Sequence, residues 1–188
     1  FSSALQVLTS QTGNRFQVRQ VPVVPVSVDY RQVSFWEALD GVLDQVQMNV
    51  DPYRGGRRAL GLVARPAEER ERRRGASYAG IFRFEPLRLE ASRNLRNPRI
   101  QGLKLALQVA WEPRVTPIFM SISTSELRAL DGQQKELAVD ALGGAVAAAI
   151  EGEQTAIELV LPLQLPSRDV RKIARIEGSL ETLMPGHA

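Results

Sequence analysis

Two kinds of hydrophobic periodicity divide the chain. Near the start, apolar residues recur every three or four positions within residues 4–8, and again from Phe35 to Val46. This spacing predicts two helices, each with one buried face. From about residue 78 onward apolar and polar residues alternate, most strictly over 103–111, which predicts strands with one buried face. We therefore expect an α+β N-terminal part followed by a mainly extended C-terminal part.

Both helices carry recognisable end signals. Ser2 or Ser3 is suited to cap the first helix, and Gly13 and Asn14 tolerate the left-handed backbone that closes it. Ser34 and Glu37 are spaced as a capping box, in which serine hydroxyl and glutamate carboxylate each accept a backbone N–H. The second helix is therefore predicted to begin at Phe35.

Short extended segments lie around these helices. Residues 16–18 are expected to be extended, and residues 23–28, next to Pro22 and Pro25, an edge strand or a loop into one. Residues 49–51 and 59–63 are predicted to form a hairpin, because Gly55 and Gly56 supply positive backbone angles for its turn. The predicted order is helix, strand, strand, helix, strand, strand.

The C-terminal part shows strands at short intervals with turn signals between them. Strands are predicted over residues 81–91, 103–111, 118–122, 157–161 and 176–182, with Asp131 and Gly132 in a turn. Regularly spaced strands of this kind are typical of an antiparallel β-sandwich with an immunoglobulin-like arrangement. The small-residue run 143–150 fits either a tightly packed strand or a loop.

The composition lacks the residues that most common catalytic and metal sites use. At 44% apolar and 24% charged, the 188 residues are typical of a folded protein, and no apolar run is long enough to cross a membrane as a helix. The chain has no cysteine, and its one histidine, His187, is next to the last residue. Thiol nucleophiles and thiolate zinc sites are excluded, and a serine triad lacks its base. We expect no catalytic residues, metal or cofactor.

Charge is distributed unevenly along the chain. Residues 54–74 contain eight arginines against three glutamates, whereas 1–53 are slightly acidic and the remainder is balanced. Both signs mix within 67–74, and no aromatic residue interrupts that run, so we interpret it as solvated and not as a nucleic-acid surface. The predicted organisation is a domain over 1–64, a charged linker over 65–77 and a β-sandwich over 78–188.

Few side chains stand out as candidate sites. Arg54, Arg57 and Arg58 surround the paired glycines and are the candidates for binding an acidic partner. Trp36 and Trp111 are candidates for a sugar-stacking platform, although core packing is the favoured interpretation. For the carboxylates of Glu151 and Glu153, the favoured interpretation over an acid and base pair is a solvated hairpin tip.

The N-terminal segments 4–14 (ALQVLTSQTGN), 26–28 (VSV) and 33–43 (VSFWEALDGVL) resemble the short N-terminal domain of secretins and TonB-dependent receptors. The resemblance covers about residues 1–64, although the strand that the family places ahead of the first helix is absent. It implies a two-helix α/β domain in an extracytoplasmic cell-envelope setting, stacking into rings or docking on a partner. Residues 78–83 and 109–114 look like a C-terminal region of secreted planctomycete-type proteins. The chain begins with Phe1, so we expect a fragment or processed product.

Three functional hypotheses follow. The first is a non-enzymatic assembly or protein-interaction module of the cell envelope, periplasmic or otherwise extracytoplasmic, that binds a protein partner or self-associates. The second is a cell-wall polysaccharide-binding or hydrolytic module that uses the tryptophans and carboxylates. The third, binding of nucleic acid through residues 54–74, is the least favoured and predicts a steep salt dependence. Whether the C-terminal part binds a small molecule stays open.

Overall fold

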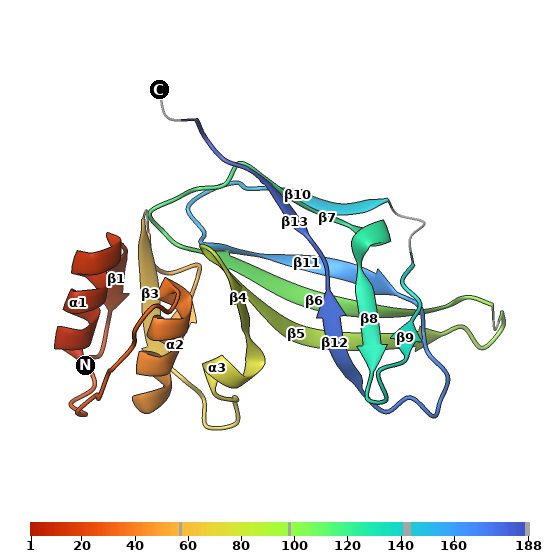
Figure 1. Cartoon of the computed structure of the whole chain (residues 1–188), viewed down its shortest axis with the longest axis horizontal. Coiled ribbons are helices and arrows are strands. Elements are labelled where there is room, and N and C mark those ends of the chain that lie inside the picture. Colours follow the sequence, from red (N-terminus) through yellow and green to blue (C-terminus); the bar gives the residue numbers. More distant parts are fainter. Residues whose placement is uncertain (57, 98, 141–143, 187–188) are drawn as a thin grey trace. The chain divides into compact units, whose positions relative to one another are not determined.

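The computed structural model describes residues 1–56, 58–97, 99–140 and 144–186, and most of its regular structure is antiparallel β-sheet (Figure 1). The helices are α1 (Ser2–Thr12), α2 (Phe35–Gln45), α3 (Arg72–Gly75) and the 3-10 helix η1 (Thr124–Glu126). The strands are β1 (Arg15–Val18), β2 (Met48–Asp51), β3 (Ala59–Ala64), β4 (Ser77–Ala79), β5 (Phe82–Arg93), β6 (Gln101–Trp111), β7 (Phe119–Ser123), β8 (Arg128–Asp131), β9 (Glu136–Leu137), β10 (Ala145–Ala149), β11 (Ala156–Leu163), β12 (Ile173–Glu177) and β13 (Leu180–Leu183).

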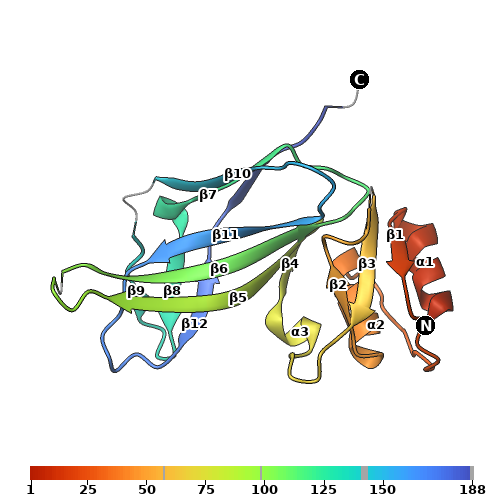
Figure 2. The same ribbon diagram turned by 180° about the vertical axis from the view of Figure 1, so that it is seen from behind.

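The chain forms two compact units, and neither is continuous in sequence. The first contains Phe1–Glu85, Gln108–Thr116 and Glu151–Ile157; the second contains Pro86–Leu107, Pro117–Ile150 and Glu158–Ala188. Strands β5, β6 and β11 therefore contribute residues to both units, and with β4 they form one sheet in the order β11-β6-β5-β4 (Figure 2). Residues 65–77, expected to be a linker, fall within the first unit.

Helix α1 ends as its sequence predicts but begins differently. Gly13 has a φ of 75° and donates its N–H to the carbonyl of Thr9 at 2.8 Å, the left-handed ending expected of glycine. The predicted serine cap is wrong, because Phe1 is the N-cap and no side chain caps the helix. Leu5 and Leu8 form the buried face.

Helix α2 is capped by the predicted serine. The Ser34 hydroxyl accepts the N–H of Glu37 at 3.2 Å, which satisfies one donor of the first turn. The second half of the predicted capping box is replaced, since the Glu37 carboxylate pairs with Arg73 at 3.2 Å. Most of the helix is buried, including the apolar residues Phe35, Trp36, Ala38, Leu39, Val42 and Leu43.

A mixed three-stranded sheet packs with these helices in the first unit. Its order is β1-β3-β2, with β1 parallel and β2 antiparallel to β3, so the predicted hairpin of β2 and β3 is confirmed. Leu60 and Leu62 of β3 join the core of the apolar helix faces. The same core includes Ala110 and Ala156, which come from much later in the chain.

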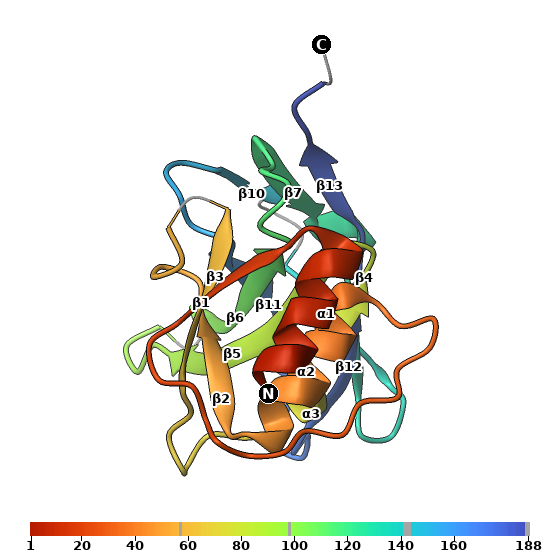
Figure 3. The same ribbon diagram turned by 90° about the vertical axis from the view of Figure 1, so that its left-hand side faces the viewer.

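Residues 23–28, expected to be an edge strand or a loop into one, form no strand. Residues 19–34 contain no helix or strand, and Figure 3 shows them as a long irregular connection between β1 and α2. Pro22 and Pro25 lack the N–H that a sheet ladder requires. At Ser27 a side chain replaces the ladder, because Gln45 accepts the Ser27 N–H at 3.0 Å and donates to its carbonyl at 2.9 Å.

The second unit contains two three-stranded antiparallel sheets, ordered β10-β7-β13 and β12-β8-β9. The β-rich, largely antiparallel character predicted for this part is confirmed. The predicted strand 176–182 is interrupted, however, and its halves join different sheets as β12 and β13. At the break, a side chain on Gly178 would place its Cβ 2.7 Å from Leu127 Cδ2. The run 143–150 contains strand β10.

Within the described residues, no helix is both long and apolar enough to cross a membrane.

The capping bond of α2 yields a first prediction. Replacing Ser34 with alanine leaves the Glu37 N–H without its acceptor, so we expect Ser34→Ala to lower the free energy of unfolding by about 1 kcal/mol. Ser34→Asp should retain stability, and Ser2→Ala, at a helix without a side-chain cap, should change it by less than about 0.5 kcal/mol. Urea denaturation followed by circular dichroism measures all three. Equal effects of Ser34→Ala and Ser2→Ala would contradict the capping role.

Candidate functional site

The most deeply buried charges of the first unit meet at Asp40 in α2. Asp40 is fully buried, and its Oδ1 accepts a hydrogen bond from Arg72 Nε at 2.6 Å. Its Oδ2 accepts from Arg83 Nε at 2.6 Å and from the Tyr78 hydroxyl at 3.0 Å. Arg83 also pairs with Glu85 and donates to the Arg72 carbonyl. No fully buried side-chain nitrogen or oxygen lacks a partner in the described part of the chain. The network is therefore saturated and structural.

The environment of Asp40 shifts the acidity of its three donors. Burial raises the pKa of Tyr78, and the negative charge of Asp40 raises it further, so the hydroxyl remains a donor. Burial lowers the pKa of Arg72, although the Asp40 charge opposes this change. Burial opposes ionisation of Arg83 too, but the charges of Asp40 and Glu85 outweigh it and raise its pKa. All three side chains are protonated at neutral pH.

Two further acids of α2 hold the neighbouring arginine-rich segment. Asp44 accepts the backbone N–H of Arg72 at 2.7 Å and of Arg73 at 3.1 Å, and it forms an ion pair with Arg65. Glu37 pairs with Arg73. These acids and the buried aspartate follow each other at three- and four-residue spacing, and so lie along one side of the helix. The expectation that residues 65–77 form a solvated linker therefore fails at Arg72, which is only 7% exposed.

A second buried polar group joins the helix α1 end to residues 108–116. The Asn14 amide donates to Glu112 Oε2 at 2.8 Å, and its oxygen accepts the Arg114 N–H at 3.2 Å. Arg114 Nε also donates to the same Glu112 oxygen at 2.7 Å. Nearby, the Trp36 indole donates to the Ile81 carbonyl at 2.9 Å. Hydrogen bonds thus connect Ile81 and residues 112–114 to the region of the two N-terminal helices.

A pocket of about 450 Å³ lies beside the turn between β2 and β3. Three segments of the first unit surround it, and its lining residues are Arg58, Trp111, Pro113, Val115, Thr116, Gly152, Glu153, Gln154 and Thr155. The Thr155 N–H donates to the Pro52 carbonyl at 3.2 Å, and the Trp111 N–H donates to the Thr155 carbonyl at 3.0 Å. These bonds connect the segments that form the walls.

The backbone of the β2–β3 turn determines where Arg58 lies. Gly56 has the predicted positive φ, 63°, whereas Gly55 is needed for another reason. A Cβ on Gly55 would lie 1.8 Å from the Ala59 carbonyl oxygen, so only glycine fits there. Arg58 itself has a φ of 61°, a left-handed conformation that is uncommon for a residue with a side chain.

The three arginines predicted to bind a partner have different positions. Arg58 lines the pocket, whereas Arg54 pairs with Asp51 at 3.0 Å and does not line it. Arg57 lies outside the described residues. Three candidates named from the sequence, Arg58, Trp111 and Glu153, line this pocket. No sequence pattern indicated that they meet, because they come from three separate segments.

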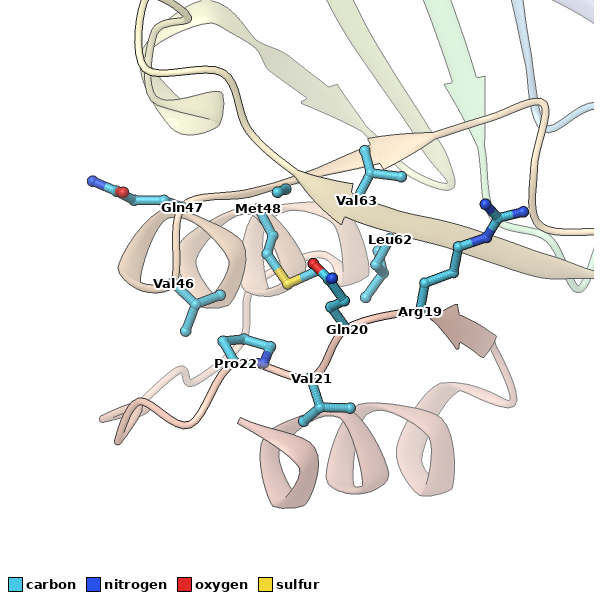
Figure 4. Close-up of a pocket in the computed structure, with 10 residues that line it drawn as sticks. Arg19, Gln20, Val21, Pro22, Val46, Gln47, Met48, Leu62 and Val63 are labelled. Carbon is cyan, nitrogen blue, oxygen red and sulfur yellow. The ribbon is translucent and has the colours of Figure 1, made fainter.

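A second pocket, of about 490 Å³, lies where the chain leaves β1 (Figure 4). Its walls are mainly apolar, with Val21, Pro22, Val46 and Met48 among the labelled side chains and Arg19 as its charged residue. The sequence indicated apolar residues at these positions but no cavity, because the pocket depends on residues 19–22 passing the end of α2.

The other candidates do not form the sites for which they were considered. Trp36 and Trp111 are 0% and 1% exposed, so neither presents a ring face to a sugar. Glu151 and Glu153 fall at a turn, and Glu153 already has an interaction partner. Asp131 accepts the backbone N–H groups of two residues in its own turn. His187 lies outside the described residues, among which no three potential metal ligands gather.

Comparison of the chain with protein-family models, curated proteins and solved structures gives no match. No relative therefore supplies a function, and the resemblance of residues 1–64 to the secretin and TonB-dependent receptor domain stays a prediction.

The buried network yields a second prediction. Asp40→Asn keeps the side-chain volume but leaves the buried Arg72 without its ion-pair partner and Arg83 with Glu85 alone, so we expect a loss of about 3–5 kcal/mol in unfolding free energy. The matched control is Asp29→Asn, which breaks an ion pair with Arg31 whose two side chains are 80% and 86% exposed. Such an exposed pair contributes about 0–1 kcal/mol. Chemical denaturation measures both variants, and a small effect of Asp40→Asn would contradict the structural role.

Proposed function

We propose that this chain is a non-enzymatic protein-interaction module of the cell envelope that associates through residues 21–28, here called the valine segment. The observation that carries the proposal is the exposure of its apolar side chains. Val23 is 100% exposed and Val21 is 54% exposed, while Val24 and Val28 are each nearly half exposed. Four exposed valines within eight residues form an apolar stretch that a partner can cover.

The valine segment contacts the rest of the unit at Val26 and Ser27, but it pairs with no described strand. Val26 packs against the core, and the two Gln45 hydrogen bonds fix Ser27. Among the described residues, the backbone of 21–28 takes part in no sheet. Because Pro22 and Pro25 lack an N–H and Gln45 already binds Ser27, the partner contact rests on the exposed valine side chains and not on a continuous strand ladder. Burying a valine side chain contributes about 1.5–3 kcal/mol, which makes the exposed side chains a driving force for association.

The pocket in Figure 4 extends this surface. Val21 and Pro22 belong both to the valine segment and to the pocket wall, so a bound partner can insert an apolar side chain beside Met48. Specific interfaces commonly gain affinity from one anchor residue in a preformed cavity. Arg19 at the same pocket favours an acidic neighbour of that anchor.

The envelope location and the finer fold assignments rest on the sequence. The resemblance of residues 1–64 to the secretin and TonB-dependent receptor domain supports a periplasmic or otherwise extracytoplasmic site. We also infer that the strands of the second unit have an immunoglobulin-like sandwich arrangement, for which their antiparallel pairing is the support.

The alternative functions have less support. Both tryptophans are buried, which removes the proposed sugar platform. Several arginines within 54–74 are paired with acids, among them Arg54, Arg65 and Arg72, so the run is not a free basic surface. Association through apolar groups is the function that the geometry supports best.

Self-association is the direct test. We expect the purified chain to associate at concentrations of about 10–100 µM and the double variant Val23→Glu, Val24→Glu to remain monomeric, because charge on the apolar stretch opposes its burial. Val7→Glu is the matched control, since Val7 is 50% exposed on α1 and lies outside the valine segment. Sedimentation velocity measures the mass of each form.

The results separate the possibilities clearly. Association of the wild type and of Val7→Glu, but not of the double variant, supports the proposal. Loss of association in both variants would show a general effect of charge. A wild-type chain that stays monomeric and forms no crosslink through residue 23 in envelope preparations would contradict the proposed function.

A further inference from the structure

We propose that the pocket beside Arg58 binds a carboxylate carried on a small apolar group. No residue of the valine segment lines this pocket, so the inference goes beyond the proposed association and does not depend on it. The described groups around the pocket combine one cation, one acid, neutral polar groups and an apolar wall.

Arg58 supplies the charge. Its side chain is exposed, and within the described residues it forms no ion pair, unlike Arg54 in the same turn. A guanidinium matches a carboxylate through two parallel N–H···O bonds, which is the strongest common pairing for this group. The carboxylate of Glu153 lines the pocket but is already engaged by another partner.

The conformation of Arg58 supports a binding role. A left-handed backbone is strained for a residue with a side chain relative to the ordinary helical region. Such strain is retained where the surroundings impose it, and it is concentrated at ligand sites. Here the close approach of Gly55 to the Ala59 carbonyl leaves no room for a side chain at residue 55, and Arg58, in the same turn, lines the pocket.

Trp111 supplies a second donor. Its indole nitrogen forms no hydrogen bond within the described residues, where no fully enclosed side-chain nitrogen lacks a partner. The nitrogen therefore keeps a small exposed area, and because Trp111 lines the pocket we infer that this area faces it. The Trp36 indole, by contrast, is bonded to the Ile81 carbonyl. A carboxylate has enough lone pairs to accept from Arg58 and from the indole together.

Size and polarity restrict the ligand further. A volume of about 450 Å³ is within the usual range for small-molecule sites. Pro113 and Val115 provide apolar walls, and Gln154 and Thr116 add neutral polar groups. One unpaired cation next to the acidic Glu153 suits a monoanion better than a doubly charged phosphate. A peptide chain end and a free organic acid share this chemistry.

The test is a titration of the full chain followed by the indole N–H signals in NMR spectra. The probes are acetyl-Ala-Leu with a free carboxyl terminus, the same dipeptide amidated, benzoate and inorganic phosphate. We expect the free dipeptide or benzoate to bind with a Kd of about 1 mM or tighter and to shift the Trp111 signal but not that of Trp36. The tighter of the two identifies the source of the carboxylate.

Two variants separate binding from folding. Arg58→Gly removes the guanidinium and relieves the left-handed strain, so it should fold at least as stably as the wild type while binding about 10- to 100-fold more weakly. Arg54→Ala removes the same charge from the same turn and should bind like the wild type. Thermal unfolding checks that both variants are folded.

Several results would overturn the proposal. These are equal binding of the amidated dipeptide, equally strong competition by phosphate, or unchanged binding by folded Arg58→Gly. The absence of any shift of the Trp111 signal at millimolar probe would do so as well. Because the titration uses small ligands, its failure would leave the association test of the valine segment unaffected.

Discussion

Burying a carboxylate destabilises a folded unit unless opposite charges and hydrogen bonds replace the water that it loses. The first unit must meet this requirement at Asp40. Its compensating groups come from Arg72, Tyr78 and Arg83. Helix α2 can therefore bury this side chain only when residues 72–83 fold back against it. The unit extends beyond residue 64 for this reason. The Ile81 carbonyl, which lies between these donors, also accepts the Trp36 indole and marks where the later strands join the core.

The same condition explains what could be predicted from the sequence. Local signals were sufficient for the two long helices, the Ser34 cap and the presence of strand β6, because each depends on neighbours within a few residues. The single buried face expected for β6 is wrong, since Ala106 and Ala110 are buried as well as Leu105 and Val109. The role of Asp40 could not be read this way. Its partners are 32 and 43 residues away in the chain, and Arg72 sits in a run whose composition is typical of solvent.

The candidate sites show a similar division. The paired glycines indicated the turn next to Arg58, but the pocket needs Trp111 and Gln154, which a linear pattern does not connect to that turn. The valine segment was expected to be a strand or a loop. It is a loop, because its two prolines lack the N–H that a strand pairing needs. In addition, the Gln45 side chain binds the Ser27 backbone groups that a neighbouring strand would otherwise pair. Exposed apolar groups thus remain on a stretch that is fixed in position.

A rigid folded unit that exposes apolar side chains and a cation without an ion-pair partner among the described residues is well suited to recognition. The saturated network around Asp40 supplies rigidity, since each of its polar groups has a partner and little freedom remains. The valine segment and the Arg58 pocket differ from it in having groups that nothing in the described chain satisfies. Association through the first and capture of a carboxylate by the second are separate activities that one folded unit can support.

Native-state hydrogen exchange tests the central claim, that residues 72–85 are an integral part of the N-terminal unit. If Asp40 joins the two segments, the protected amides of α2 and those of residues 72–85 should open together, with one free energy and one dependence on denaturant. Exchange of residues 72–85 at a distinctly lower free energy, while α2 stays protected, would contradict the account and return this segment to the status of a linker.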